Sequence, residues 1–201
     1  MEDQPILTIV GERVALGPLR RDLLPDYVRW VNDLSAARNA APIAGPVPYE
    51  SELAWFERAS VTRDAAHFTI YVRALRATGA LVYDPPTAEA DAPAPMWLPL
   101  GRASLNRIDR HNRTAEYAIV IGEQDARGRG YGTEVTRQIL DYAFNPAGVA
   151  AYRKVGFREF GVRREAHWMG GRFWDTIYME CLASEFTSPY LAPIFAPAAP
   201  R

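Results

Sequence analysis

The sequence predicts one mixed α/β domain, because stretches with strand periodicity alternate with stretches of helical periodicity over 201 residues. Phe68, Ile70 and Val72 alternate with more polar neighbours, as on a half-buried strand. Further along, apolar residues recur at helical spacing between Val135 and Ala143. A glycine-rich stretch separates that helix from the strand before it. A chain of this length can bury a single core of useful size.

The first part of the chain is expected to hold a strand, two helices and the strand around Ile70. The first strand covers 13–19, and the helix after it continues to Leu34 with apolar residues at roughly helical spacing. The second helix covers 49–59, with Pro48 directly ahead of it.

Residues 75–99 differ from their surroundings in composition, since they are rich in Ala, Pro and acidic residues. The runs 84–86 and 92–95 contain prolines, which lack the backbone donor that regular strand pairing needs. We predict a long, mobile and irregular connection between two strands of one domain.

The second part is expected to hold two strands, 101–108 and 114–122, joined by a polar turn, and then a helix over 131–144. A short helix follows over 146–155, with Asn145 as N-cap and Gly156 as C-terminal cap. Strands over 158–162 and 173–182 complete the domain. We predict that the domain covers 1–186 and that the Pro-rich tail 187–201 is irregular.

Composition excludes several classes of protein. The chain has 23 basic and 24 acidic side chains and a net charge of -1, so it has no electrostatic feature that predicts a nucleic-acid or membrane partner. A single cysteine, Cys181, rules out an internal disulfide and a Cys-based metal cluster, and the three histidines lack metal-ligand spacing. No apolar run approaches the roughly 18 residues of a membrane span, and no secretory signal is recognisable. We therefore expect a cytoplasmic protein without a metal.

The most informative stretch is 124–133, which lies between a strand and a helix and carries Gly128, Gly130 and Gly132. Glycines let the backbone curl around a ligand, and the helix N-terminus adds N–H donors and a positive dipole end. These features predict a phosphate cradle, with Arg127 and Arg129 close enough to help. A solvent-exposed turn that merely uses glycine explains this fragment equally well. The spacing is neither that of a P-loop nor that of a dinucleotide fold.

Several segments, taken in order, resemble the GNAT acetyltransferases. Arg127-x-x-Gly130-x-Gly132 resembles the acyl-CoA pyrophosphate loop of that family, and 145–157 resembles its Asn-helix-Tyr-x-Lys-x-Gly-Phe segment. Residues 112–122 resemble its central strand. The segment 163–168, with 178–179, resembles the subgroup related to the Rim-type ribosomal-protein N-terminal acetyltransferases. The resemblance implies a central mixed, mostly antiparallel twisted sheet with helices on both faces, and acetyl-CoA as co-substrate.

The resemblance also implies site residues. Main-chain groups of the central strand would hold the pantetheine arm and polarise the thioester, and the pyrophosphate would lie on the glycine loop. The implied cofactor-binding residues are Ile119, Val120, Ile121, Arg127, Gly128, Arg129, Gly130, Tyr131, Gly132, Thr133 and Asn145. Tyr152 would be the general acid that protonates the departing thiolate, and we favour this over a helix tyrosine that only packs on the sheet. Glu116 is a candidate general base or, equally, an exposed strand-edge glutamate.

The sequence departs from the family between Phe144 and Asn145, where the family has a loop and a whole strand. Either the strand is deleted, or another segment takes its place, or residues are missing from the sequence at this point. Loss of the strand would expose one edge of the central strand, which predicts a homodimer or an aggregation-prone monomer.

Three functions therefore stay open. The leading one is acetyl transfer to a primary amine, either a protein N-terminus or a small molecule. The alternatives are an impaired acyl-CoA-binding or regulatory protein and an interaction module without a ligand.

Overall fold

The computed structural model describes residues 4–33, 35, 45–77, 80–83, 96–112, 114–143, 157–169, 172–180, 182 and 185–186. Several predictions fall outside these residues. They are the helix over 146–155, the residues Asn145 and Tyr152, the junction 144–145 and the tail 187–201.

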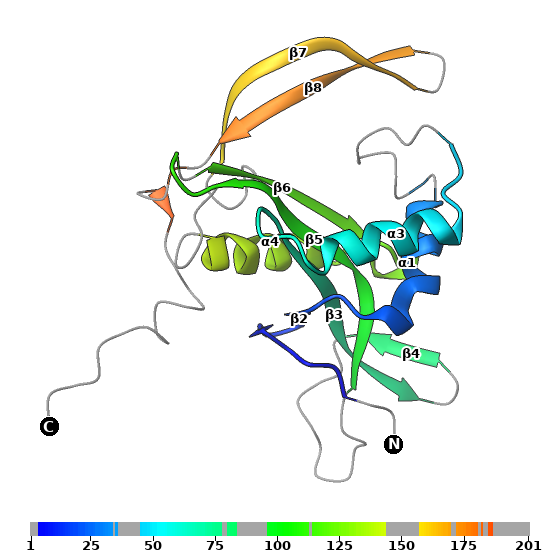
Figure 1. The fold of residues 1–201 in the computed structure, drawn as a ribbon. Helices are drawn as coiled ribbons and strands as arrows, with labels where there is room; N and C mark the ends of the chain where they lie inside the picture. Colours follow the sequence, from blue (N-terminus) through cyan, green and yellow to red (C-terminus); the bar gives the residue numbers. More distant parts are fainter. Residues whose placement is uncertain are drawn as a thin grey trace, which may run out of the picture.

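An antiparallel sheet of six strands forms the centre of the fold (Figure 1). Its strands, in spatial order, are β1 (Ile9–Val10), β2 (Val14–Gly17), β3 (Ala66–Ala77), β5 (Met96–Asp109) and β6 (Thr114–Ile121). The sixth, β4 (Ala80–Tyr83), pairs with β3 beyond the end of β2. Every pairing in this sheet is antiparallel, as predicted for most of it.

The two faces of the sheet are covered by different helices, which confirms the predicted arrangement. Successive side chains of a strand point to opposite faces, so each strand contributes to two cores. On one face, Leu16, Ile70 and Leu105 pack with Val135 and Ile139 of α4 (Tyr131–Tyr142).

The other face is covered by α1 (Leu24–Val31), which follows the 3-10 turn η1 (Arg21–Leu23), and by α3 (Tyr49–Ala59). Leu24, Tyr27 and Trp30 of α1 pack with Phe56 of α3 in a second core. The predicted bounds of α3 and the predicted start of α4 are confirmed.

The structure corrects the bounds of the irregular connection predicted over 75–99. Strand β3 continues to Ala77, β4 covers Ala80–Tyr83, and β5 begins at Met96. The ends of the segment are strand because β3 pairs there with both neighbours, as at Leu75 with Val82 and at Ala74 with Met96. The proline runs lie outside the described residues, and Pro99 lies directly beside a register shift in the pairing of β3 with β5. Local composition did not reveal this pairing because it joins residues distant in sequence.

Strands β7 (Arg158–Met169) and β8 (Arg172–Glu180) form a separate antiparallel hairpin, drawn in yellow and orange beyond β6 in Figure 1. Strand β7 is longer than predicted, and β8 ends earlier. The buried Phe157 packs against Leu140 of α4 at the base of the hairpin. Among its described side chains, the hairpin exposes the large apolar residues Phe160, Val162, Phe173, Ile177 and Tyr178. Among the described strands, β6 pairs only with β5.

In the described part of the chain, no helix is both long enough and apolar enough to cross a membrane.

Candidate active site

The glycine loop leaves the end of β6 and leads into α4 through the 3-10 turn η2 (Gln124–Ala126). Gly128 and Gly130 have φ angles of 77° and 86°, in the left-handed region that favours glycine. A Cβ added at Gly128 or Gly132 would meet nothing within 4 Å, so a ligand can approach the backbone there. The N–H groups of Thr133 (3.1 Å) and Glu134 (3.2 Å) both donate to Gly130 O, and the N–H groups before them, at the start of α4, have no acceptor within the helix. This geometry fits a pyrophosphate.

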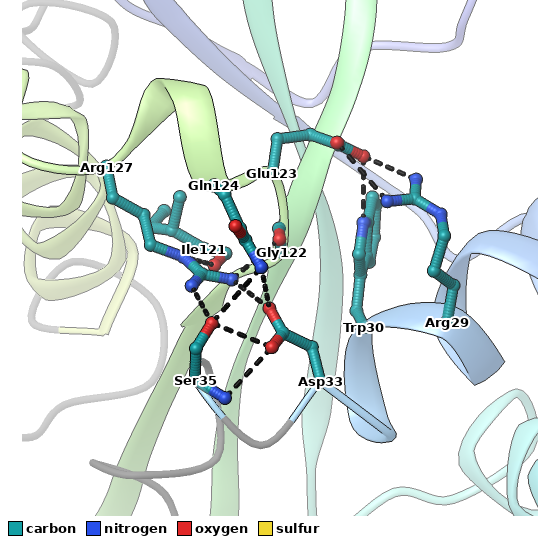
Figure 2. A network of polar contacts seen from close by, with 9 residues as sticks. All are labelled: Arg29, Trp30, Asp33, Ser35, Ile121, Gly122, Glu123, Gln124 and Arg127. Carbon is teal, nitrogen blue, oxygen red and sulfur yellow. Dashed lines mark hydrogen bonds and ion pairs between the residues drawn. The ribbon is translucent and has the colours of Figure 1, made fainter.

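The Arg127 side chain holds this loop in shape through hydrogen bonds to nearby backbone carbonyls (Figure 2). Its Nε donates to Ile121 O at 2.9 Å, and Nη2 donates to Gly122 O at 2.8 Å. The same guanidinium donates to Ser35 Oγ at 2.6 Å and to Asp33 Oδ2 at 2.7 Å. The hydrogen bonds from Arg127 and Ser35 hold the pKa of Asp33 well below its ordinary value. Arg127 therefore ties the loop to the chain that follows α1.

Glu123 makes a second connection between the loop and α1 (Figure 2). Its Oε1 accepts hydrogen bonds from Nη2 of Arg29 at 2.5 Å and from the indole Nε1 of Trp30 at 2.9 Å. Burial opposes ionisation of Glu123, but the bonds from Arg29 and Trp30 outweigh it and lower its pKa. The residue before Glu123 is Gly122, where a Cβ would overlap the Trp30 ring at 2.2 Å. The loop therefore has a fixed position relative to α1.

Arg13 and Glu134 join the loop to β2, and sequence reasoning missed both. The buried carboxylate of Glu134 accepts the backbone N–H groups of Arg13 (2.9 Å) and Val14 (3.2 Å) and the Nε of Arg13 (3.1 Å). Nη1 of Arg13 also donates to Arg129 O at 3.0 Å, in the middle of the glycine loop. An acidic residue in the first turn of a helix is common for reasons of helix polarity alone, so its role was not visible in the sequence.

A pocket of about 180 Å³ opens on the α1/α3 face of the sheet, directly against β6. Its lining residues are Leu19, Trp55, His67, Arg102, Ala103, Ser104, Ala118, Ile119 and Val120. Ile119 and Val120 are two of the predicted cofactor-binding residues. The strand that lines the pocket therefore also leads into the glycine loop.

Arg102 is fixed between two aromatic rings at the wall of this pocket. Its Cζ lies 4.3 Å from the centroid of the Trp55 ring and 5.0 Å from that of Tyr27. Nη1 forms an ion pair with the buried carboxylate of Glu52 on α3. The charge of Arg102 is therefore largely balanced within the protein.

His67 lies on β3, half-buried, with its ring edge-on to Trp55 at a centroid distance of 5.4 Å and an angle of 80°. Burial lowers the pKa of His67, and the nearby charge of Arg102 lowers it further, while Asp64 opposes the shift. The imidazole is consequently biased towards its neutral form.

The other predicted residues are distributed around these features. Glu116 lies on the same face of β6 as Ala118 and Val120, but it is exposed, forms an ion pair with Arg107 and does not line the pocket. In the loop, Arg129 donates from Nε to Asp125 O at 2.9 Å, and Tyr131 is buried. The N–H of Thr133 donates to Gly130 O at 3.1 Å.

Comparison with known proteins identifies the family. Residues 13–164, well over half of the chain, match the model of the acetyltransferase (GNAT) domain. The chain belongs to this family. A curated relative, the spermidine N(1)-acetyltransferase of Vibrio cholerae serotype O1, is 28% identical over 102 residues. That alignment covers 43% of this GNAT chain and spans 58% of the length of the relative.

Solved structures share the GNAT fold. The spermidine N-acetyltransferase of Vibrio cholerae in complex with CoA and spermine superposes with a TM-score of 0.66 at 18% identity. That match covers 87% of this chain and 98% of the other. The spermidine/spermine N-acetyltransferase of the same species, in complex with manganese ions, gives a TM-score of 0.59 at 20% identity and covers 86% and 94% of the two chains. At these identities, the likeness concerns the fold.

Proposed function

We propose that this chain transfers an acetyl group from acetyl-CoA to a primary amine within a ternary complex. The observation that supports this most directly is the continuity of β6. The strand lines a pocket with Ile119 and Val120 and then runs into a glycine loop that has the geometry of a pyrophosphate cradle. A cofactor arm along β6 would bring its thioester to the pocket, and an acceptor in the pocket would meet it there.

The candidate cofactor-binding residues and Tyr152 each have a place in this proposal. The backbone of 128–133 would bind the pyrophosphate, and main-chain groups of Ile119, Val120 and Ile121 would position the thioester. Arg127 and Arg129 would act chiefly by keeping the loop in shape, because both donate to backbone carbonyls of that region. Asn145 and Tyr152, which lie outside the described residues, would complete the cofactor site, with Tyr152 as the general acid.

The chemistry of the pocket narrows the class of acceptor. Among the described residues that line it, none carries a carboxylate, and Glu52 beside it is already paired with Arg102. A polyamine with several positive charges would gain little from this lining. We therefore favour an acceptor with a single reactive amine, such as the α-amine of a peptide, which also agrees with the Rim-type resemblance of 163–168. Spermidine, the substrate named for the relatives, is the alternative.

Two measurements test the proposal. Acetyl-CoA at 100 times its dissociation constant should stabilise the fold by about 2.7 kcal/mol, seen as a rise in Tm. Addition of a short peptide with a free α-amine should then release free thiol, and spermidine should release it more slowly. A Tm shift without thiol release from either amine would favour an impaired acyl-CoA-binding protein. No shift at millimolar acetyl-CoA would contradict both functions and favour an interaction module.

The outer edge of β6 and the apolar side chains of the β7–β8 hairpin support a further part of the proposal, that the chain forms a homodimer. Among the described strands, β6 has no partner on its outer edge, and this edge together with exposed Phe160 and Ile177 favours association with a second copy. Light scattering should then give twice the monomer mass. A monomer with full activity would contradict this. A cytoplasmic location stays a prediction.

A further inference from the structure

The pocket beside β6, where the proposed acceptor would bind, contains a side chain that can exchange a proton near neutral pH. Membership of the GNAT family does not by itself assign a role to this side chain. Among the described lining residues, Arg102 carries a guanidinium and Ser104 a hydroxyl, and neither is a residue type that serves as a general base on its own. The remaining lining side chains, His67 apart, are those of Trp55 and of aliphatic residues, which do not titrate. The imidazole of His67 is therefore the group in this lining whose chemistry suits a general base.

The register of the sheet places His67 opposite the strand that would hold the thioester. His67 pairs with Ser104 of β5, and Ser104 pairs with Ala118 of β6. The three side chains thus form a row across neighbouring strands on the pocket face. Since adjacent strands lie about 4.8 Å apart, the backbones of β3 and β6 are separated by roughly 10 Å. Strand β5 lies between them, and its side chain in this row is the small Ser104, so the pocket above β5 leaves room for an acceptor amine between the imidazole and β6.

The surroundings of His67 favour a neutral ring that can accept a proton. From β5, Arg102 opposes a positive charge on the imidazole, and burial under α3 has a larger effect in the same direction. Asp64, which precedes β3, favours the charge, and Glu52 of α3 is occupied by Arg102. On the β6 side, Ala118 and Val120 contribute no charge to the lining. The Trp55 ring fixes the imidazole edge-on, which limits its rotation.

Glu116, the base suggested by the sequence, is less well placed for this role. It lies two residues before Ala118, about 7 Å further along the strand, and it is absent from the pocket lining. Its carboxylate is largely exposed and forms an ion pair with Arg107 outside the pocket.

We infer that His67 is the catalytic base that takes the proton of the acceptor amine in the pocket; this inference rests on the proposed acetyl transfer. The amine nitrogen forms a bond to the thioester carbonyl carbon, and the carbon–sulfur bond breaks with its electron pair on sulfur. One nitrogen proton passes to a ring nitrogen of His67. The sulfur leaves as a thiolate and takes a proton from water, and His67 then returns to its neutral state by releasing its proton to water.

A substitution series with pH profiles tests this role. His67→Gln should lower kcat/KM by about 10²-fold or more with a short peptide α-amine or spermidine as acceptor. In the wild type, kcat/KM should fall as the acceptor amine becomes protonated, at about pH 8 for an α-amine, and should then fall along a second, steeper acid limb as the pH drops through the pKa of His67, below the ordinary histidine value of 6.5. This limb should be lost in the variant, while the Tm shift with acetyl-CoA should be unchanged. Exogenous imidazole should restore part of the rate of His67→Ala, a response that a purely structural role would not give.

His111→Gln is the matched control, because His111 lies in the exposed turn after β5 and should keep the wild-type rate and pH profile. An unchanged rate in His67→Gln, or a lower rate that keeps the second acid limb and shows no imidazole rescue, would overturn the inference while leaving acetyl transfer intact. A wild-type chain that binds acetyl-CoA but releases no thiol with either amine would instead contradict the proposed function, and with it the reaction that His67 serves.

Discussion

Nη2 of Arg127 donates to Oδ2 of Asp33 at 2.7 Å, which joins the glycine loop to the chain that follows α1. The partners are 94 residues apart in sequence. The same guanidinium donates to Ser35 and to the carbonyls of Ile121 and Gly122. Asp33 therefore orients the Arg127 side chain, which in turn holds the shape of the loop.

Asp33→Ala should therefore weaken acetyl-CoA binding several-fold, since the loop loses its brace and binding must then restore its shape. Calorimetric titration with acetyl-CoA measures the change. Asp22→Ala is the control, because Asp22 pairs with Arg20 on the surface and has no contact with the loop in the described structure. Equal affinities of the two variants would show that the brace is not needed for binding.

Glu134→Ala should destabilise the fold by about 2–3 kcal/mol. The substitution removes the acceptor of the backbone N–H groups of Arg13 and of the buried Val14, and it removes the carboxylate that pairs with the Arg13 guanidinium. Urea unfolding measures the change. Glu57→Ala, which breaks the exposed pair with Arg21, should stay within about 0.5 kcal/mol of wild type. A similar small effect at Glu134 would mean that its hydrogen bonds contribute little.

Gly130→Val should abolish the Tm shift with acetyl-CoA at a cost in stability of about 1–2 kcal/mol. The residue has a φ of 86°, which a β-branched side chain adopts only with strain, and its Cβ would lie 3.3 Å from Nη2 of Arg13. Gly161→Ala on the hairpin is the control, because its added Cβ would meet nothing within 4 Å and its φ is not left-handed. Retention of the shift in Gly130→Val would place the cradle elsewhere.

Tyr152→Phe should lower kcat by about 10²-fold or more while leaving the affinity for acetyl-CoA nearly unchanged. The change keeps the ring and removes the phenolic proton that the departing thiolate needs. Steady-state kinetics with saturating acetyl-CoA give kcat, and the Tm shift reports on binding. An unchanged kcat would show that Tyr152 is not the general acid and would favour the alternative that it only packs on the sheet.

Local pattern predicted those parts of the fold whose causes are local. The bounds of α3 and the start of α4 follow from the spacing of apolar residues and from Pro48 and Gly130, which directly precede the first residues of the two helices. The extension of β3 to Ala77 was missed because its partners, β4 and β5, come later in the chain. The turn after β5 was visible because Asp109 and Asn112 bond within four residues.

The candidate site also has one part that depends on consecutive residues and another that depends on residues distant in sequence. The glycine loop could be predicted, since its residues are consecutive and their conformational freedom is a property of the residue type. The pocket could not be predicted, because His67, Arg102 and Trp55 come from three elements and meet only through sheet register and helix packing. Arg127 is one residue whose position was predicted but whose partners, Asp33 and Ser35, were not.

The hydrogen bonds that Glu123 accepts from Arg29 and Trp30 of α1 have a consequence for how the two substrates affect each other. Arg29 and Trp30 belong to the same helix as Tyr27, which stacks on Arg102 at the pocket wall. A shift of the loop on acetyl-CoA binding would be transmitted through this helix to the acceptor pocket. Thermodynamic reciprocity then requires the acceptor to change the affinity for acetyl-CoA by the same factor as acetyl-CoA changes the affinity for the acceptor. Glu123→Gln weakens the contact between the loop and α1 without removing either binding site. In this variant, the factor by which each substrate changes the affinity for the other should be closer to one.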